Sequence, residues 1–332
     1  MKRILLAILA TASCFMAKAQ VDPHFSEYYV YPSWLNPALT GAIDGDYRIS
    51  AIYRNQWGSI ASGFSTIGLS GDVVTNKNLN FGASILQQTA GNGGYTYLTA
   101  YASVAYTGVR FGLEGNQRLV FALQGGLIQR RFNTSKFQLG DQWTPSAGYS
   151  PSTVTSDIIA SPSSSTFDAG AGIAYYDASP NKKANLFLGF SASHLTQPDD
   201  RFTSGATKGR LPIRYTAHGG VKLNLGSGFS ITPNLLYLRQ GTAEEKMAGA
   251  YAQVRATDNV DVMLGANYRF KDAIVPFAGF YYKSFTLGLS YDINSSDLGR
   301  AAGSANSFEL SLSWTGRKNK ELAGKNFVCP RL

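Results

Sequence analysis

The sequence predicts an all-β protein: a single transmembrane antiparallel β-barrel of the outer-membrane type, with about 14 strands. Three observations point to this fold class, namely an export signal at the N-terminus, many strand-length segments of alternating polarity, and connections of two distinct lengths. The chain has 332 residues, of which 44% are hydrophobic. After residue 19 no apolar run approaches the roughly 20 residues that a membrane helix needs, so strands would have to make any crossing of a membrane.

The first 19 residues have the order of a secretory signal peptide. Lys2 and Arg3 provide the positive region, residues 4–10 are apolar, and Ala17-Lys18-Ala19 places small residues at the two positions that a signal peptidase reads. We therefore expect cleavage near Ala19-Gln20 and a final location in the outer membrane of a Gram-negative cell. Cys14 would suit a lipoprotein signal instead, although a threonine stands where that motif has a leucine-like residue.

Alternation of apolar and polar residues marks the strands. In 213–223, for example, Ile213 and Tyr215 lie on one face of an extended chain, and Arg214 and Thr216 lie on the other. The segments are about as long as the 9–11 residues that cross a bilayer obliquely. This pattern predicts strands at 46–57, 63–72, 79–88, 95–110, 117–132, 166–177, 185–195, 211–224, 228–239, 246–255, 259–270, 274–282, 283–292 and 306–315.

The connections favour a membrane barrel over a soluble β-sandwich or propeller, which would also show alternation. If the first strand starts in the periplasm, the periplasmic links are short and the long links 133–165, 196–210 and 293–305 all lie outside. Outer-membrane barrels have this asymmetry, and an even number of strands returns the C-terminus to the periplasm. The expected parts are a signal peptide at 1–19, an N-terminal periplasmic segment or plug at 20–44, the barrel at 45–315 and a C-terminal periplasmic tail at 316–332.

Exposed aromatic side chains are the main candidates for contact with protein partners. Residues 20–44 contain three prolines and form a stiff aromatic strip, which could plug the periplasmic mouth, dock on a periplasmic partner or simply pack against the first strands. The loop 133–165 exceeds the length of about 15 residues beyond which loops are usually functional or disordered. The candidates are Phe25, Tyr28, Tyr29 and Trp34 in the segment, Phe137, Trp143 and Tyr149 in the long loop, Arg201 in the loop 196–210, and Cys329 in the basic tail.

Charged side chains are expected on the lumen faces of the strands. A polar interior is typical of these barrels, and charges in it need water or partners. Structural pairing is favoured over conduction of an anion, because opposite charges occur on the same faces. The charges expected in the lumen are Arg48, Arg54, Arg214, Lys222, Asp261, Arg269 and Glu309.

Enzymatic chemistry has little support in the sequence. The three histidines lack the spacing of metal ligands, and no glycine-rich phosphate loop opens a helix. We therefore expect no catalytic, cofactor-binding or metal-binding residues. A hydrolase would have to depend on His218, which shares a predicted lumen face with Arg214. The formal net charge of +9 does not indicate a nucleic-acid partner, because an exported protein meets outer-membrane lipid instead.

Several spaced motifs occur in one order along the chain. They are Asp22–Tyr28 (D-P-H-F-S-E-Y), Leu35–Gly41 (L-N-P-A-L-T-G), Tyr53–Trp57 (Y-R-N-Q-W) and the tail Cys329–Leu332 (C-P-R-L). Together they resemble the PorP/SprF family of the type IX secretion system, and the resemblance covers essentially the whole mature chain. The tail departs from the family pattern at Leu332, where the family has an aromatic residue.

The resemblance implies a function, whereas alternation indicates only the barrel. It implies a non-enzymatic outer-membrane component of type IX protein secretion, which in some bacteria also supports gliding motility. Such a component receives or anchors secreted cargo, such as surface adhesins, through the C-terminal domain of the cargo. Its partners would be other secretion-system proteins in the outer membrane and periplasm. The alternative is an outer-membrane channel or transporter for small or hydrophobic solutes, because about fourteen strands can enclose a lumen.

Overall fold

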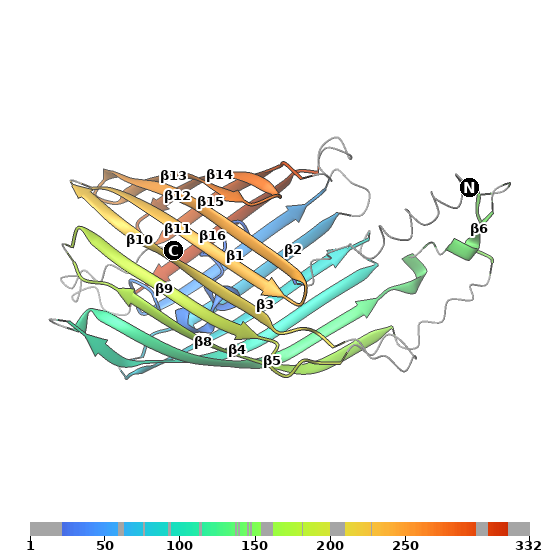
Figure 1. Ribbon diagram of the computed structural model, residues 1–332, viewed down its shortest axis with the longest axis horizontal. Coiled ribbons are helices and arrows are strands. Elements are labelled where there is room, and N and C mark those ends of the chain that lie inside the picture. The colour runs from blue at the N-terminus through green and yellow to red at the C-terminus, as the bar shows by residue number, and fades with distance from the viewer. Residues whose placement is uncertain are drawn as a thin grey trace, which may run out of the picture.

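Fourteen long strands lie side by side in the computed structural model and close into an antiparallel barrel (Figure 1). Neighbours in the sequence are neighbours in the wall, so the topology is a simple up-and-down meander. The prediction of the fold class is confirmed. The structure describes residues 22–58, 63–75, 77–91, 94–112, 115–136, 138, 140–144, 146, 148–153, 162–180, 182–199, 210–226, 228–296 and 305–317.

Each wall strand corresponds to one of the fourteen predicted segments, with ends that differ by a few residues. The strands alternate in residue polarity and are rich in β-branched and aromatic residues, which fit a half-buried pleated surface. The wall consists of β1 (Tyr47–Gln56), β2 (Phe64–Val73), β3 (Leu79–Ala90), β4 (Tyr95–Phe111), β5 (Gln117–Phe132), β8 (Ser163–Asp177), β9 (Ala184–Ser193), β10 (Arg214–Gly226), β11 (Phe229–Gln240), β12 (Ala243–Thr257), β13 (Val260–Arg269), β14 (Ala273–Tyr282), β15 (Phe285–Asn294) and β16 (Ser307–Gly316).

The first and last strands pair to close the wall. β1 runs antiparallel to β16 in a register that extends from Tyr47 opposite Gly316 to Gln56 opposite Ser307. Closure satisfies the backbone hydrogen bonds of both strands, which an open edge in lipid would leave unpaired. Since β1 and β16 are also the ends of the barrel sequence, the chain enters and leaves the wall at the same rim.

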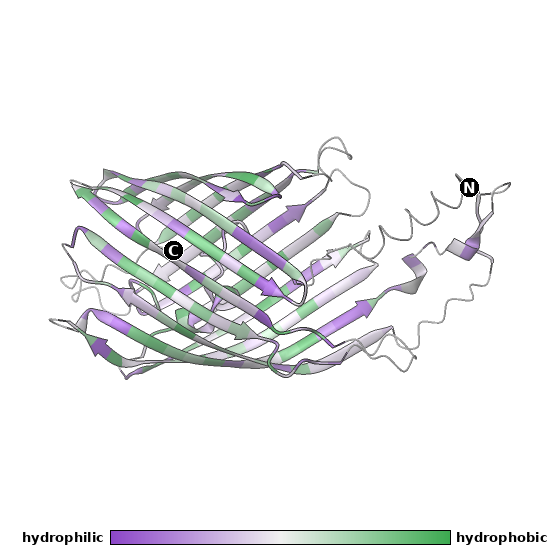
Figure 2. Ribbon diagram, viewed as in Figure 1, coloured by the Kyte–Doolittle hydropathy of each residue, from purple (hydrophilic) through white to green (hydrophobic). Residues whose placement is uncertain are grey.

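The two faces of the wall differ as the alternation predicts. On β16 the side chains of Phe308, Leu310 and Leu312 point outward and are exposed, whereas Ser307 and Glu309 point inward and are buried. Figure 2 shows the same change of hydropathy from residue to residue along most strands. An apolar outer surface and a polar inner one are what a bilayer requires of a barrel.

The two rims carry connections of different length. At one rim, which we call the short-link rim, the strands are joined by brief turns such as Asp258–Asn259 between β12 and β13. At the opposite rim, the long-link rim, β5 and β8 are separated by residues 133–162, whose described part includes a small hairpin of β6 (Trp143–Thr144) and β7 (Gly148–Tyr149). This hairpin projects beyond the barrel wall in Figure 1.

The described part of the chain contains only short helical turns. The α-helix α2 (Pro32–Leu35) and the 3-10 helix η1 (Pro37–Leu39) lie before β1, and the 3-10 turns η3 (Thr134–Lys136) and η4 (Gly140–Gln142) lie between β5 and β6. Among the described residues no helix has the length and apolar character to cross a membrane.

Candidate functional site: a lumen filled by the N-terminal segment

Residues 22–44, which we call the N-terminal segment, run through the barrel. Their start lies at the long-link rim, where Asp22 contacts Arg214 at the beginning of β10. Their end lies at the short-link rim, where Asp44 contacts Arg317 just after β16. The sequence left open a plug of the periplasmic mouth, a docking element for a periplasmic partner and a leader packed against the first strands. In the structure the segment lies along the lumen from rim to rim, because its side chains find partners on the wall near both rims. Figure 1 shows its blue trace between the walls.

Proline and asparagine set the local shape of the N-terminal segment. α2 and η1 each begin with a proline, Pro32 and Pro37, whose fixed φ suits the first helical position. Between the two helices the amide oxygen of Asn36 accepts a hydrogen bond from the backbone N–H of Ala38 at 2.9 Å. Gly41 then turns the chain with a φ of +75°, in the left-handed region that favours glycine. The motif L-N-P-A-L-T-G is therefore a compact double turn that fits inside the barrel.

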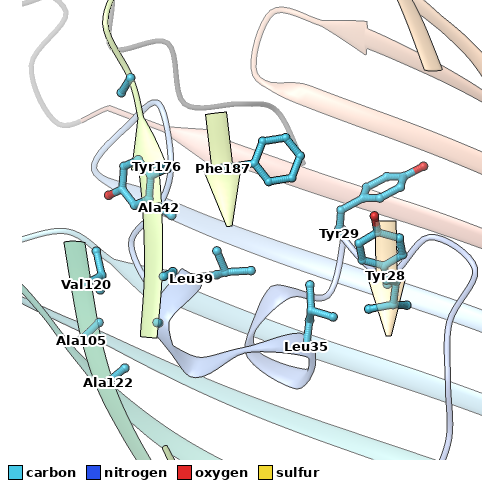
Figure 3. Packing of buried hydrophobic residues seen from close by; sticks show 14 of the residues in the cluster. Tyr28, Tyr29, Leu35, Leu39, Ala42, Ala105, Val120, Ala122, Tyr176 and Phe187 are labelled. Carbon is cyan, nitrogen blue, oxygen red and sulfur yellow. The ribbon is translucent and has the colours of Figure 1, made fainter. Parts of the chain in front are cut away.

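Apolar packing holds one side of the segment to the wall. Ala38 and Leu39 of η1 are buried against small and branched residues on β4, β5 and β8, including Ala105 and Val120. Figure 3 shows Leu39 between these strands and Leu35 further along the segment, near Tyr28. Small wall residues leave the room that the two helices need. The expected loss on removing a buried leucine from such a contact is about 2–5 kcal/mol.

Aromatic side chains fill the lumen on other sides. The Tyr29 ring packs edge-on against Phe277 of β14, with centroids 5.6 Å apart, and lies 6.1 Å from the ring of Tyr251 on β12. Tyr31 reaches the wall near Gly68, where an added Cβ would lie 3.1 Å from the tyrosine ring. Its hydroxyl donates a hydrogen bond to the backbone carbonyl of Ile85 at 2.8 Å.

A cluster of buried charges holds the segment in the half of the lumen near the long-link rim. The Glu309 carboxylate accepts hydrogen bonds from the backbone N–H groups of Ser26 at 2.6 Å and Glu27 at 2.8 Å. The same carboxylate pairs with Arg54, which also donates to Asp292 at 2.8 Å. Asp292 and Glu309 therefore both bind Arg54 on the wall, and Glu309 also binds the backbone of the segment directly.

Arg269 extends this buried cluster on the wall. Its guanidinium donates to Asp292 at 2.9 Å and to Asp272 at 3.0 Å, and it also donates to the hydroxyl of Ser26. Arg54 and Arg269 thus both donate to the hydroxyl of Ser26, and the acidic groups around them are Asp292, Glu309, Asp272 and Glu245. Charges this deep are stable only when they are paired and hydrogen-bonded, as they are here.

A second polar network fixes the start of the segment at the long-link rim. His194, fully buried just after β9, contacts Asp22 at 2.6 Å through Nε2 and Asp168 at 2.8 Å through Nδ1. Arg214 donates to Asp22 at 3.0 Å, and its guanidinium lies 4.2 Å from the centre of the Trp34 ring. The backbone of His194 has a φ of +60°, an unusual conformation for a non-glycine residue that the two contacts help to hold.

The protonation of His194 follows from this geometry. Burial alone would lower the pKa of His194, but the charge of Asp22 and the hydrogen bonds to both carboxylates outweigh it and raise the pKa to about 9. Burial works to raise the pKa of Asp22, yet the charges of His194 and Arg214 hold it well below its usual range. At neutral pH the pair is a buried ion pair that ties the segment to the wall.

A third polar contact holds the end of the segment near the short-link rim. Asp72 on β2 accepts a hydrogen bond from the backbone N–H of Gly41 at 2.6 Å and pairs with Arg48 on β1 at 2.9 Å. The segment is thus fixed by charged groups near both rims, with two clusters toward the long-link rim and one toward the short-link rim.

The structure gives different positions to the predicted partner-binding residues. Phe25, Tyr28, Tyr29 and Trp34 are buried inside the barrel, so contact with a partner would require the segment to leave the lumen. In the long loop, Trp143 is 53% exposed and packs on Tyr149, with ring centroids 5.7 Å apart. The residues Phe137, Arg201 and Cys329 lie outside the described residues.

The predicted lumen charges separate into two groups. Those that contact the segment directly are Arg48, Arg54, Arg214, Arg269 and Glu309. The other two, Lys222 and Asp261, lie near the short-link rim, where Asp261 accepts a hydrogen bond from Gln253 at 2.7 Å. His218 contacts the amide of Asn36 at 3.2 Å, so it helps to seat the segment. Within the described ranges no group of histidine, cysteine and acidic residues is arranged to hold a metal ion.

Sequence reasoning missed three residues that hold the segment. Asp72 shares a strand face with Ser70, so alternation alone would have placed it in the lumen opposite Arg48. Asp22 lies in the first of the spaced motifs, Asp22–Tyr28, which served only to identify the family resemblance. His194 gave no local signal, because its role depends on two carboxylates that are distant in the sequence.

The fold and the site define a class of protein: an outer-membrane β-barrel whose lumen is filled by its own N-terminal segment. A family model described as "Type IX secretion system membrane protein PorP/SprF" matches residues 17–314. The chain belongs to this family, and the resemblance seen in the motifs is confirmed. The family and the barrel fold place the protein in the outer membrane as a membrane component of type IX secretion. Comparison with curated proteins finds no match.

Solved structures with a similar fold are outer-membrane barrels of low sequence identity. The toluene transporter TbuX of Ralstonia pickettii matches with a TM-score of 0.51 at 9% identity, over 85% of this chain and 92% of the transporter. The toluene transporter TodX of P. putida matches with a TM-score of 0.48 at 10% identity, over 87% of this chain and 95% of the transporter. A FadL homologue of Pseudomonas aeruginosa matches with a TM-score of 0.44 at 13% identity, over 90% of this chain and 95% of the homologue. At these identities the likeness to TbuX concerns the fold alone.

Proposed function

We propose that the chain is a non-enzymatic part of the type IX secretion system that receives or anchors secreted cargo, such as surface adhesins, through contacts between proteins. The observation that supports this best is the filled lumen, which the N-terminal segment crosses from rim to rim. A barrel filled in this way offers its rims, rather than an open pore, as working surfaces.

The long-link rim is the surface on which we place the cargo. Its β6–β7 hairpin projects from the wall and exposes Trp143 beside Tyr149. Aromatic residues with a large contact area commonly anchor protein interfaces. In the outer membrane this rim would face the outside, as long connections do in barrels of this kind.

Isolation of the tagged barrel from native membranes tests this proposal. The intact barrel should retain secreted proteins, and their separately produced C-terminal domains should bind the purified barrel. Replacement of residues 133–161 by a short Gly/Ser linker should abolish this retention while the barrel stays folded. The double variant Trp143→Ala, Tyr149→Ala should weaken it. Cargo that binds the linker variant as well as the intact barrel would refute this role of the rim.

The alternative function is a channel or transporter for small or hydrophobic solutes. It is supported by the likeness to the fold of a toluene transporter and by a cavity of about 80 Å³ between the N-terminal segment and β10–β12. Phe25, Tyr28 and Trp34 line this cavity with Leu238. If the alternative holds, liposomes that contain the barrel should take up toluene faster than protein-free liposomes, and Ala243→Trp, at the cavity wall, should slow the uptake. Equal uptake by both kinds of liposome would exclude it.

A further inference from the structure

A hollow of about 780 Å³ lies on the outer face of the wall, over the neighbouring strands β9–β12 (Figure 1). Leu188, Leu235 and Phe270 line it, and these side chains point outward and are at least half exposed. The hollow is several times larger than the cavity of about 80 Å³ in the lumen. Since the outer face of a membrane barrel meets hydrocarbon, lipid or protein has to fill the hollow.

The hollow exists because small residues stand at outward positions of two strands. Ala217 and Gly219 stand on β10 and Ala248 stands on β12, whereas β11 between them carries Leu235 and Tyr237. In the register of the sheet, Gly219 and Ala248 lie on either side of Leu235. The outer face therefore has two shallow lanes, the β10 lane at Ala217 and Gly219 and the β12 lane at Ala248, which a ridge of larger side chains separates.

Basic residues gather at the end of the hollow near the long-link rim. Lys246 lines this end, and its ammonium lies 5.9 Å from the centre of the Tyr237 ring and 3.1 Å from the Glu244 carboxylate. Arg239 stands opposite Glu244 in the register, and Lys271 is exposed in the turn between β13 and β14 at the same rim. Three cations beside one carboxylate leave an excess of positive charge at this end.

The aromatic residues of the wall indicate the depth of these charges in the membrane. Tyr215 and Tyr268 point outward, are nearly half exposed, and lie at the same end of the hollow as Lys246. Tyrosines at such positions lie at the level of the lipid headgroups. The basic residues are therefore at the level of the lipid phosphates, and the two lanes extend from there toward the middle of the bilayer.

We propose that the hollow binds one molecule of a phosphate-bearing glycolipid with several acyl chains, the lipopolysaccharide of the outer leaflet. A phosphate of the lipid lies against Lys246 and Arg239, and acyl chains lie in the two lanes, on either side of Leu235. The choice of leaflet rests on the proposed outward orientation of the long-link rim. The site would hold a lipid beside the rim on which we place the cargo.

The dimensions and charges of the hollow favour a lipid over a second protein. Leu188 and Leu235 stand opposite Gly219 on the strands to either side, so their backbones are about 10 Å apart. The gap between these two side chains admits a single acyl chain, whereas a helix with its side chains is about 10–12 Å wide. A protein would also have to bring acidic groups to Lys246 and Arg239, whereas lipid phosphates are already present at this level.

Lipid binding to the purified full-length barrel tests the proposal. The barrel in a non-ionic detergent would be titrated with lipid A, the phosphorylated and acylated anchor of lipopolysaccharide, and native mass spectrometry would count the bound lipid. Lys246→Gln combined with Arg239→Gln removes the basic end, and Ala248→Trp fills the β12 lane. Lys283→Gln is the matched control for charge, because Lys283 also lies over a tyrosine ring, at 5.1 Å, but at the short-link rim. Ala100→Trp, outward on β4 and away from the hollow, is the control for bulk.

We expect one bound lipid A per barrel, binding weaker by about tenfold or more in the charge variant and in Ala248→Trp, and unchanged binding in both controls. Equal binding by the site variants and the controls would overturn the proposal, as would binding of phosphatidylglycerol as tight as that of lipid A. In native membranes, a photo-crosslinking residue in place of Ala248 should label lipopolysaccharide, and labelling of a protein instead would overturn the proposal. The titration contains no cargo, so its result does not depend on the proposed role in secretion.

Discussion

Replacement of Glu309 by alanine should loosen the N-terminal segment. The Glu309 carboxylate accepts both backbone N–H groups at the start of the segment, from Ser26 and Glu27, and also binds Arg54. Without it, those two N–H groups lose their acceptor inside the barrel, and Asp292 becomes the remaining acidic partner of the wall arginine.

The expected size follows from the two hydrogen bonds. A hydrogen bond to a charged group contributes about 1.5–3 kcal/mol, so the loss of two costs about 3–6 kcal/mol. Even the lower figure shifts the equilibrium between the docked and the released segment by a factor of about 100. Glu309→Gln keeps one acceptor oxygen at the same place, and we expect a shift of about tenfold.

Thiol labelling measures this release. Thr40, which is 2% exposed in the segment, would be replaced by cysteine in a background without Cys14 and Cys329. The rate of modification by a bulky maleimide then reports the released fraction, and it should rise about 100-fold with Glu309→Ala. Glu244→Ala, on the exposed end of β12, is the control and should leave the rate unchanged. Equal rates for Glu309→Ala and the unaltered barrel would refute the role of this carboxylate.

A rise in pH should weaken the docking of the segment start. The pKa of His194 lies above its ordinary value, so its stabilising contribution is complete below about pH 6.5 and is lost as the pH passes through about 9. Hydrogen exchange at residues 22–28 should therefore speed up relative to the rest of the barrel between pH 7 and 10. Asp22→Asn should remove this pH dependence. If the ratio of exchange rates between residues 22–28 and the rest of the barrel does not change with pH, the pairing is contradicted. Leu39→Ala should lower the free energy of unfolding by about 2–5 kcal/mol, because the Leu39 side chain is buried between the rest of the segment and the barrel wall. Leu312→Ala, on the exposed outer face, is its control in a urea titration and should cost less; equal losses would show that the segment packing adds nothing.

The barrel wall was predictable because its signal is local. A side-chain period of two, read in each segment separately, predicts a strand and its two faces without knowledge of its neighbours. β16 is an example, since the outward Phe308 and Leu310 alternate with the inward Ser307 and Glu309. Closure and meander order then follow from the short connections and from the need to leave no edge in lipid.

The position of the N-terminal segment was harder to predict, because it depends on contacts between distant parts of the chain. The aromatic residues of the segment suggested a partner surface, and the structure buries them against the wall. One signal was available: Met263 and Phe277 stand on strand faces that should be polar in a water-filled lumen, and both pack in the cluster that contains Tyr29. Apolar residues on the inner face of a barrel indicate that something apolar fills it.

Single-channel conductance in planar bilayers is the measurement that tests the filled lumen most directly. The intact barrel should be nearly silent, because the N-terminal segment fills the lumen and is fixed by charged groups near both rims. A barrel that lacks residues 22–40, refolded under the same conditions, should show stable open channels. Open channels of equal conductance in both proteins would contradict a lumen that the segment closes.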